Sequence, residues 1–155
     1  MKAAPDRPGI IAPPPLLYLL PFGAGLWLQH HLPLPLELGG LAAWLGWPLV
    51  VAGVLGFVLA LWTLGRAGTS VNPYRASSAV AAAGIYRFTR NPIYLADTLV
   101  YLGAVLLCAT LWPLLLLPLA LMAVQKGVIA REEAYLERKF GADYLDYKNR
   151  VRRWL

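Results

Sequence analysis

Charged residues are scarce in this sequence. Asp, Glu, Lys and Arg make up 14% of it, whereas a soluble domain averages about 25%. Three stretches, 8–36, 38–65 and 98–125, contain no charged residue at all, and each is longer than the roughly 20 apolar residues with which a helix crosses a bilayer. This scarcity excludes an ordinary soluble domain and predicts an all-α, polytopic integral membrane protein, with residues 1–155 forming a single domain.

Cysteine is nearly absent as well. Cys108 is the only one, which excludes an intrachain disulfide. The adjacent His30 and His31 have no third ligand nearby in the sequence, so we expect no metal site. The net charge is +6, but no basic segment matches a nucleic-acid-binding motif. We therefore expect membrane lipids, and no nucleic acid, as partners of the positive charge.

The basic residues that are present fall into three clusters. Lys2 and Arg7 precede the first apolar stretch, the second cluster lies within 66–90, and the third lies within 126–153. Because basic loops tend to stay in the cytosol, all three clusters and both termini should lie there. The stretch 98–125 must then cross the membrane twice, as a helical hairpin beginning at Pro92. The alternative is one long, tilted, proline-kinked helix.

These constraints predict four transmembrane helices and a cytosolic helical extension. The helices are expected over 15–30, 42–64, 92–108 and from 112 onward. Asn91 and Pro92 are typical of an N-cap and a first helical residue. The last helix should leave the membrane near Lys126 and continue to Phe140, where Gly141 is a typical stop. A further amphipathic turn or two is expected within 143–150.

Two segments outside the apolar stretches carry groups suited to chemistry. The connector 65–91 is longer than two helices need, and its second half mixes arginines with aromatics; an interfacial belt is the alternative explanation. Farther on, Glu133 shares a helical face with apolar residues, whereas Glu132 lies to one side. A carboxylate on such a face is costly unless paired, although both could simply pair with surface cations.

Three motifs follow one another in the second half of the chain. They are 84–94 (Gly-Ile-Tyr-Arg-Phe-Thr-Arg-Asn-Pro-Ile-Tyr), 131–136 (Arg-Glu-Glu-Ala-Tyr-Leu) and 140–147 (Phe-Gly-Ala-Asp-Tyr-Leu-Asp-Tyr). In this order they resemble the isoprenylcysteine carboxyl methyltransferase and phospholipid methyltransferase superfamily, as do the approach 68–73 and the ending 151–155. The resemblance covers about 64–155. It implies a helical membrane enzyme whose pocket, mainly within 65–155, encloses S-adenosylmethionine.

The resemblance also implies which residues form the site. The cofactor-binding residues would be Gly84, Ile85, Tyr86, Arg90, Asn91, Pro92, Tyr94, Glu132 and Glu133. Many members have His where this chain has Asn91. Arg90 and Glu133 are the expected catalytic residues, and Asp97, Tyr147 and Arg150 are the expected acceptor contacts. Asp97 stands where a small or apolar residue is usual. It should face the same pocket, marking a different substrate, or pair with an arginine of the connector.

The chemistry of these side chains fits the cofactor. A sulfonium cation is stabilised by a carboxylate or an aromatic face, and the cofactor carboxylate by Arg90 or a helix N-terminus. The expected function is methyl transfer to a lipophilic or small amphipathic acceptor at the cytosolic face of a bacterial inner membrane. A prenylcysteine-like carboxylate, a lipid headgroup and a thiol all stay open, and Glu133 is the expected base if one is needed. The alternatives are an NADPH-dependent reductase of the sterol-reductase type and a non-enzymatic scaffold.

Overall fold

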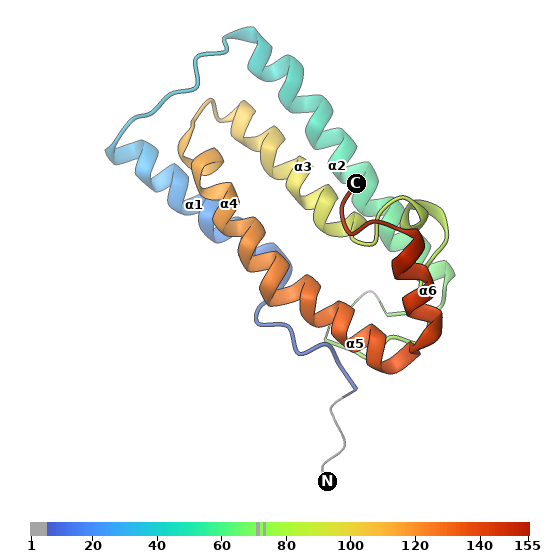
Figure 1. The fold of residues 1–155 in the computed structure, drawn as a ribbon. Helices are drawn as coiled ribbons and strands as arrows, with labels where there is room; N and C mark the ends of the chain where they lie inside the picture. The colour runs from blue at the N-terminus through green and yellow to red at the C-terminus, as the bar shows by residue number, and fades with distance from the viewer. Residues whose placement is uncertain (1–5, 71, 73) are drawn as a thin grey trace.

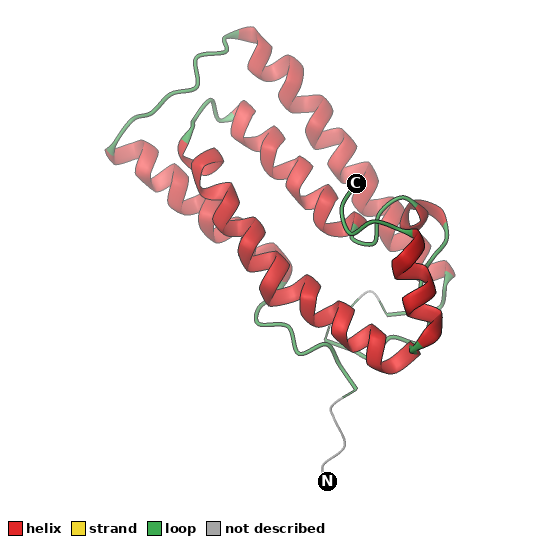
Figure 2. Cartoon of the chain, viewed as in Figure 1, coloured by secondary structure: helices red, strands yellow, loops and turns green. Residues whose placement is uncertain are grey.

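The computed structural model describes residues 6–70, 72 and 74–155 and shows a helical protein in which those residues form no strand (Figures 1 and 2). Lys2 of the first basic cluster, and Val71 and Pro73 of the connector, lie outside the described residues. The helices are α1 (Pro14–His31), α2 (Gly40–Arg66), the 3-10 turn η1 (Gly84–Arg87), α3 (Pro92–Leu107), α4 (Trp112–Val124), the π-helical turn η2 (Gln125–Ile129), α5 (Ala130–Phe140) and α6 (Ala142–Arg150).

Proline and glycine explain where several of these helices begin and end. Proline occupies the first or second position of α1, α3 and α4, where its missing N–H costs no hydrogen bond. The helix that starts at Trp112 ends at Phe140, because Gly141 has a φ of 53° that ordinary residues avoid. The predicted starts at Pro92 and near Trp112 and the predicted stop at Gly141 are therefore confirmed.

The stretch 98–125 is divided between two helices, α3 and α4, which are separated by residues 108–111. Each packs mainly on a helix from the first half of the chain: α3 lies along α2, and α4 lies along α1 (Figure 1). Glycines permit the close approach of α2 and α3. A Cβ on Gly53 would lie 2.7 Å from the backbone oxygen of Ala96, too close for any larger residue. Small residues at such contacts are typical of helices packed within membranes.

Two helical segments are long and apolar enough to cross a membrane. They are α2, with 27 residues, and the continuous run 112–140, with 29; α3 is apolar but shorter. Large apolar side chains of α2 are exposed, including Trp44 at 80% and Trp62 at 57%. Exposed apolar surface on this scale requires a nonaqueous partner. Together with the helix lengths, it indicates a membrane protein.

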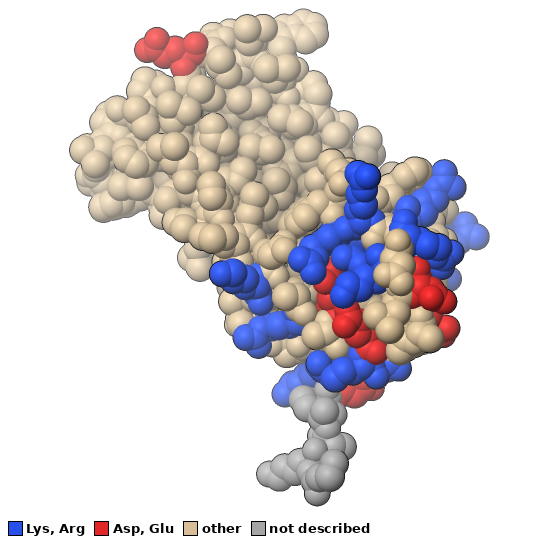
Figure 3. All heavy atoms as spheres, in the orientation of Figure 1, with Lys and Arg blue, Asp and Glu red and all other residues tan. Residues whose placement is uncertain are grey.

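Charge is concentrated at one end of the molecule, over the connector, α5 and α6 (Figure 3). Residues 112–129 of the long run contain a single charged residue, Lys126, whereas α5 carries Glu and Arg side chains throughout. At about 1.5 Å per residue, 18 residues reach about 27 Å, close to the thickness of the hydrocarbon core. The helix α5 therefore projects beyond the apolar part of the bundle, where the predicted extension was placed.

The π-helical turn η2 was not predicted. It interrupts the long run at Gln125–Ile129, between its apolar and charged parts. Such turns free backbone groups from the regular ladder and occur frequently at functional sites. Here the carbonyl of Gly127 accepts a hydrogen bond from the backbone N–H of Ile11 at 3.1 Å. The turn thus ties the segment before α1 to the start of the charged end.

Candidate active site

A cavity of about 250 Å³ lies at the charged end. It is lined by the start of α1 and the segment before it, the end of α2, the connector, the start of α3, α5 and α6. Nine of the residues predicted for the site line it: Tyr86, Arg90, Asn91, Pro92, Tyr94, Asp97, Glu132, Glu133 and Tyr147. Gly84, Ile85 and Arg150 are not among the lining residues. Tyr135, Tyr144 and Arg75 line the cavity too and were not predicted.

The residues outside the lining have other contacts. Gly84, with a φ of 56°, is so close to α2 that a Cβ would lie 2.7 Å from Oγ1 of Thr63. This contact packs the start of η1 on α2. Arg150 is exposed, and its Nε donates to the backbone carbonyl of Asp146. Gly84 therefore supports the wall of the cavity from behind, and Arg150 lies on the outer surface.

Glu132 is the less restrained of the two adjacent glutamates. The hydroxyl of Tyr94 donates to both of its carboxylate oxygens, at 2.9 and 2.8 Å, and Tyr94 is its one hydrogen-bond partner among the described residues. Burial raises the pKa of Glu132 to about 7; the Tyr94 hydrogen bond opposes this rise and the neighbouring Glu133 carboxylate adds to it. A carboxylate with a single neutral donor retains free lone pairs for a cation in the cavity.

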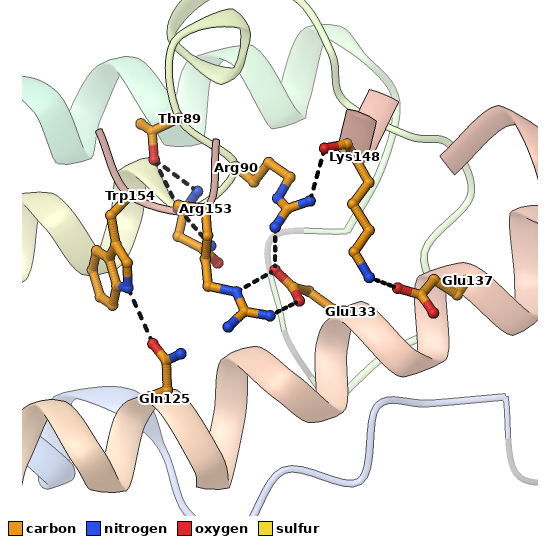
Figure 4. Close-up of polar contacts among 9 residues, drawn as sticks. Thr89, Arg90, Gln125, Glu133, Glu137, Lys148, Arg153 and Trp154 are labelled. Carbon is orange, nitrogen blue, oxygen red and sulfur yellow. Dashed lines mark hydrogen bonds and ion pairs between the residues drawn. The ribbon is translucent and has the colours of Figure 1, made fainter. Parts of the chain in front are cut away.

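Glu133 lies in an ion cluster with two arginines (Figure 4). Arg153 binds it through both oxygens, with Nε to Oε1 at 3.0 Å and Nη2 to Oε2 at 2.6 Å. Arg90 approaches from the other side, with Nη2 3.1 Å from Oε1. The Glu133 side chain is 7% exposed, so its charge must be compensated by neighbours. The cluster of Arg90, Glu133 and Arg153 carries a formal charge of about +1 at neutral pH.

One of the three guanidinium nitrogens of Arg90 has no hydrogen-bond partner among the described residues. Its Nη1 donates to the backbone carbonyl of Lys148 at 3.1 Å and its Nη2 contacts Glu133. Its Nε is buried and has no hydrogen-bond partner in the part of the chain that is described. A buried guanidinium N–H without an acceptor costs free energy. Arg90 lines the cavity, and an anionic ligand group that reached this buried N–H would satisfy it.

Asn91 occupies the predicted position but uses its side chain elsewhere. It occupies the N-cap position of α3, but its side chain forms no capping hydrogen bond. Its amide Nδ2 instead donates to the backbone carbonyl of Arg153 at 2.9 Å, and Thr89 Oγ1 donates to the same carbonyl at 3.1 Å. The predicted N-cap position is therefore confirmed, while the side-chain amide binds a distant carbonyl instead of the helix end.

Asp97 lies on the wall of the cavity, one helical turn beyond Ile93. No arginine of the connector pairs with it, and its carboxylate forms no hydrogen bond within residues 6–70, 72 and 74–155. A carboxylate at this depth is costly without a partner. Asp97 was predicted either to face the pocket or to pair with an arginine of the connector. In the structure it lines the cavity.

Aromatic hydroxyls hold the walls together. Tyr147 on α6 donates to the backbone carbonyl of Tyr86 at 2.7 Å, which attaches η1 to α6. Tyr135 on α5 donates to Asp6 at 2.8 Å and accepts from the N–H of Ser77 at 3.0 Å. Burial raises the pKa of Tyr86 and of Tyr147 above the usual value, so both phenols are neutral at physiological pH.

Sequence comparisons identify the family. The model of the family described as phospholipid methyltransferase matches residues 41–143, which include the connector, α3 and α5. A protein of Haemophilus influenzae, described as uncharacterized, is 36% identical over 63 residues, covering 41% of this chain and 79% of that protein. No solved structure shows significant similarity. Because the family model matches well over half of the chain, the protein belongs to the phospholipid methyltransferase family.

Proposed function

We propose that the protein is a membrane methyltransferase that uses S-adenosylmethionine to methylate a lipophilic or small amphipathic acceptor. The observation that carries this proposal is the presence at one cavity of a carboxylate without a cationic partner, Glu132, and a guanidinium nitrogen without an acceptor, Arg90 Nε. A ligand that carries both a cationic and an anionic group would satisfy both with charge-assisted hydrogen bonds. At about 250 Å³ the cavity is close to the lower end of the roughly 300–1,000 Å³ typical of small-molecule sites.

The residues present fit S-adenosylmethionine, which supplies a methyl group on a positively charged sulfur. Arg90 would bind the cofactor carboxylate through Nε, as a charge-assisted hydrogen bond. Glu132 and the face of Tyr94 would stabilise the positive charge. The apolar end of α2, with Phe57 and Leu61, would enclose the uncharged part of the cofactor.

The two adjacent glutamates, Glu132 and Glu133, have different roles in this proposal. Glu133 is compensated by two arginines, so its contribution is to hold Arg90 in place rather than to bind the cation. Glu132 takes the position facing the sulfonium. Methyl transfer requires mainly that donor and acceptor be aligned and water excluded, and the buried walls formed by α5 and α6 provide both.

The acceptor would approach on the side of Asp97 and Tyr147. Asp97 is the cavity carboxylate nearest the apolar part of the bundle, since α3 runs from Pro92 into the membrane. An acceptor carrying an N–H or O–H could donate to it, and Asp97 could then accept the proton during transfer. A thiolate or carboxylate acceptor needs no base. An apolar acceptor would enter from the bilayer between helices.

For the membrane, we propose that α1, α2, α3 and α4 all cross, with α3 and α4 as a hairpin. The connector, α5, α6 and both termini would then face the cytosol of a bacterium whose inner membrane holds the protein. Support comes from the concentration of charge at one end (Figure 3) and from the apolar surface of the rest. Basic segments on one side of the membrane follow the positive-inside tendency.

A ligand comparison tests the enzyme class. Purified protein in detergent is heated with S-adenosylhomocysteine, with NADPH, or alone, and labelled products are then sought after incubating it with methyl-labelled S-adenosylmethionine and a native lipid extract. We expect stabilisation by S-adenosylhomocysteine and a labelled lipid product. Stabilisation by NADPH instead would support the reductase, and stabilisation by neither would support a scaffold; either result contradicts the proposal.

A further inference from the structure

The segment after α6, residues 151–155, lies against the connector through backbone contacts (Figure 4). The N–H of Arg90 donates to the carbonyl of Arg152 at 2.9 Å. The side chains of Thr89 and Asn91 both donate to the carbonyl of Arg153. Three consecutive residues of the predicted cofactor motif therefore direct donors at two consecutive carbonyls of this segment. These three hydrogen bonds hold residues 151–155 in one position against the connector.

The same segment is attached to two further elements. The Arg153 guanidinium binds Glu133 of α5 through both oxygens. The indole N–H of Trp154 donates to the side-chain oxygen of Gln125, the first residue of η2, at 3.1 Å, and the Trp154 ring packs against the apolar core. Residues 151–155, which we name the latch, thus join the connector, the charged helix and the end of the apolar run.

We infer that Arg153 is a positioning residue of the cofactor site, acting on the ligand through Glu133 and Arg90. This inference rests on the proposed function. Glu133 contacts both guanidinium groups, and the fork of Arg153 holds its two oxygens in a fixed plane. With Arg153 in place, Glu133 contacts Arg90 only through Nη2. The Nε of Arg90 has no hydrogen-bond partner among the described residues.

Loss of Arg153 would leave Glu133 with Arg90 as its single cation. The Arg90 guanidinium would then turn to form two bonds to Glu133, because a buried carboxylate retains the strongest available pairing. Its Nε would cease to be free for the ligand. The latch would also lose its attachment to α5, so the N–H of Arg90 would be less well protected from solvent.

The chain provides a matched control for this inference. Arg152 is adjacent, has the same charge, and presents an exposed side chain, while only its backbone carbonyl contacts the connector. Arg153→Gln and Arg152→Gln therefore remove equal charge from the same segment. Arg153→Lys retains the charge but lacks the bidentate fork, and Trp154→Phe removes the contact to Gln125 while keeping an aromatic ring.

The ligand test compares S-adenosylhomocysteine with 5′-methylthioadenosine, which lacks the amino-acid end. By calorimetry, Arg153→Gln should weaken S-adenosylhomocysteine binding about 10-fold, as loss of one charge-assisted contact predicts. Its affinity for 5′-methylthioadenosine should stay within about 2-fold, and Arg152→Gln should change neither. Arg153→Lys should restore part of the affinity, to within about 3-fold of the unaltered protein.

Hydrogen exchange provides a second readout that needs no ligand. The Arg90 amide should exchange at least about 10-fold faster in Arg153→Gln and Trp154→Phe than in Arg152→Gln, because local opening sets the rate. Equal exchange rates of the Arg90 amide in Arg153→Gln and Arg152→Gln would contradict the inference that Arg153 holds the latch against the connector. Equal losses of affinity for both ligands would overturn the positioning role. Failure of the unaltered protein to bind S-adenosylhomocysteine would contradict the proposed function. The exchange rates would still test whether Arg153 holds the latch against the connector.

Discussion

The adjacent glutamates Glu132 and Glu133 differ sharply in environment, although one peptide bond joins them. Glu133 has two arginines, whereas Glu132 has a single tyrosine hydroxyl. The two arginines compensate Glu133, whereas burial without a cationic partner raises the pKa of Glu132 to about 7. Because a raised pKa leaves Glu132 neutral at lower pH and ionised at higher pH, its attraction for a cation should increase as pH rises through 7.

This titration gives a prediction for S-adenosylmethionine binding. Between pH 6 and pH 8 the ionised fraction of a group with a pKa of 7 rises about 10-fold, so the affinity should rise by up to this factor. S-adenosylhomocysteine, which lacks the sulfonium charge but keeps the amino and carboxyl groups, should show a smaller rise. Calorimetry at the two pH values measures both.

The variant Glu132→Gln provides the control for this titration. It cannot ionise, so the difference in pH dependence between the two ligands should disappear. An unchanged difference in Glu132→Gln would assign the titration to another group. Equal pH dependence of the two ligands in the unaltered protein would remove Glu132 from contact with the sulfonium.

Replacement of Asp97 should reduce methyl transfer to the acceptor without changing the affinity for the cofactor. In the variant Asp97→Asn, we expect S-adenosylhomocysteine affinity within about 2-fold of the unaltered protein, since separate contacts contribute independently. The amount of labelled product formed from a native lipid extract should fall at least about 10-fold, as loss of a proton acceptor predicts. A loss of S-adenosylhomocysteine affinity as large as the loss of product would instead place Asp97 at the cofactor.

Among the elements, the contact between α2 and α3 determines where Tyr94 and Asp97 lie. A Cβ on Gly53 would meet the backbone of α3, whereas a Cβ on Gly56 would lie 3.5 Å from the nearest atom, an ordinary contact. Gly53→Ala should therefore destabilise the protein by about 1–3 kcal/mol through overpacking. Gly56→Ala should be neutral or stabilising, because alanine favours helix.

Thermal unfolding of the two alanine variants in the same detergent measures the difference. The comparison is matched, since both substitutions add one methyl group to the same helix. Equal transition temperatures would mean that α2 and α3 are not as closely packed as the structure has them. A lower transition in Gly56→Ala alone would contradict the assigned contact.

The boundaries of these elements were largely predictable from the sequence, because local chemistry determines them. Pro92, Trp112 and Gly141 mark helix ends through effects that involve only neighbouring residues. The turn η2 was not predictable, since Gln125–Ile129 is compatible with an ordinary helix and its contacts are made by Ile11 and Trp154. Helical periodicity likewise placed Glu133 on a buried face but could not identify Arg153 as its partner, 20 positions away.

At the scale of the whole molecule, apolar surface and charge are separated along one axis (Figure 3). Such separation aligns the protein in a bilayer, with the charged end in water. The sequence predicted this separation because it depends on where the charged residues fall along the chain. The cavity could not be located in the same way, since it requires the connector, α5, α6 and the latch to meet in space.

The proposed crossing number can be tested with single cysteines, because Cys108 is the only native one. On a Cys108→Ala background, Glu37→Cys, Ala76→Cys and Asp143→Cys each place a thiol at an exposed position: between α1 and α2, in the connector, and in α6. With four crossings, a membrane-impermeant maleimide added to intact cells should label position 37 alone, since positions 76 and 143 then share the cytosolic side. If α3 and α4 together crossed only once, position 143 would be labelled while position 76 stayed protected, and this result would contradict the hairpin. Labelling of position 76 in intact cells would instead reverse the proposed orientation. The cavity would then lie on the side of the membrane that lacks cytosolic S-adenosylmethionine.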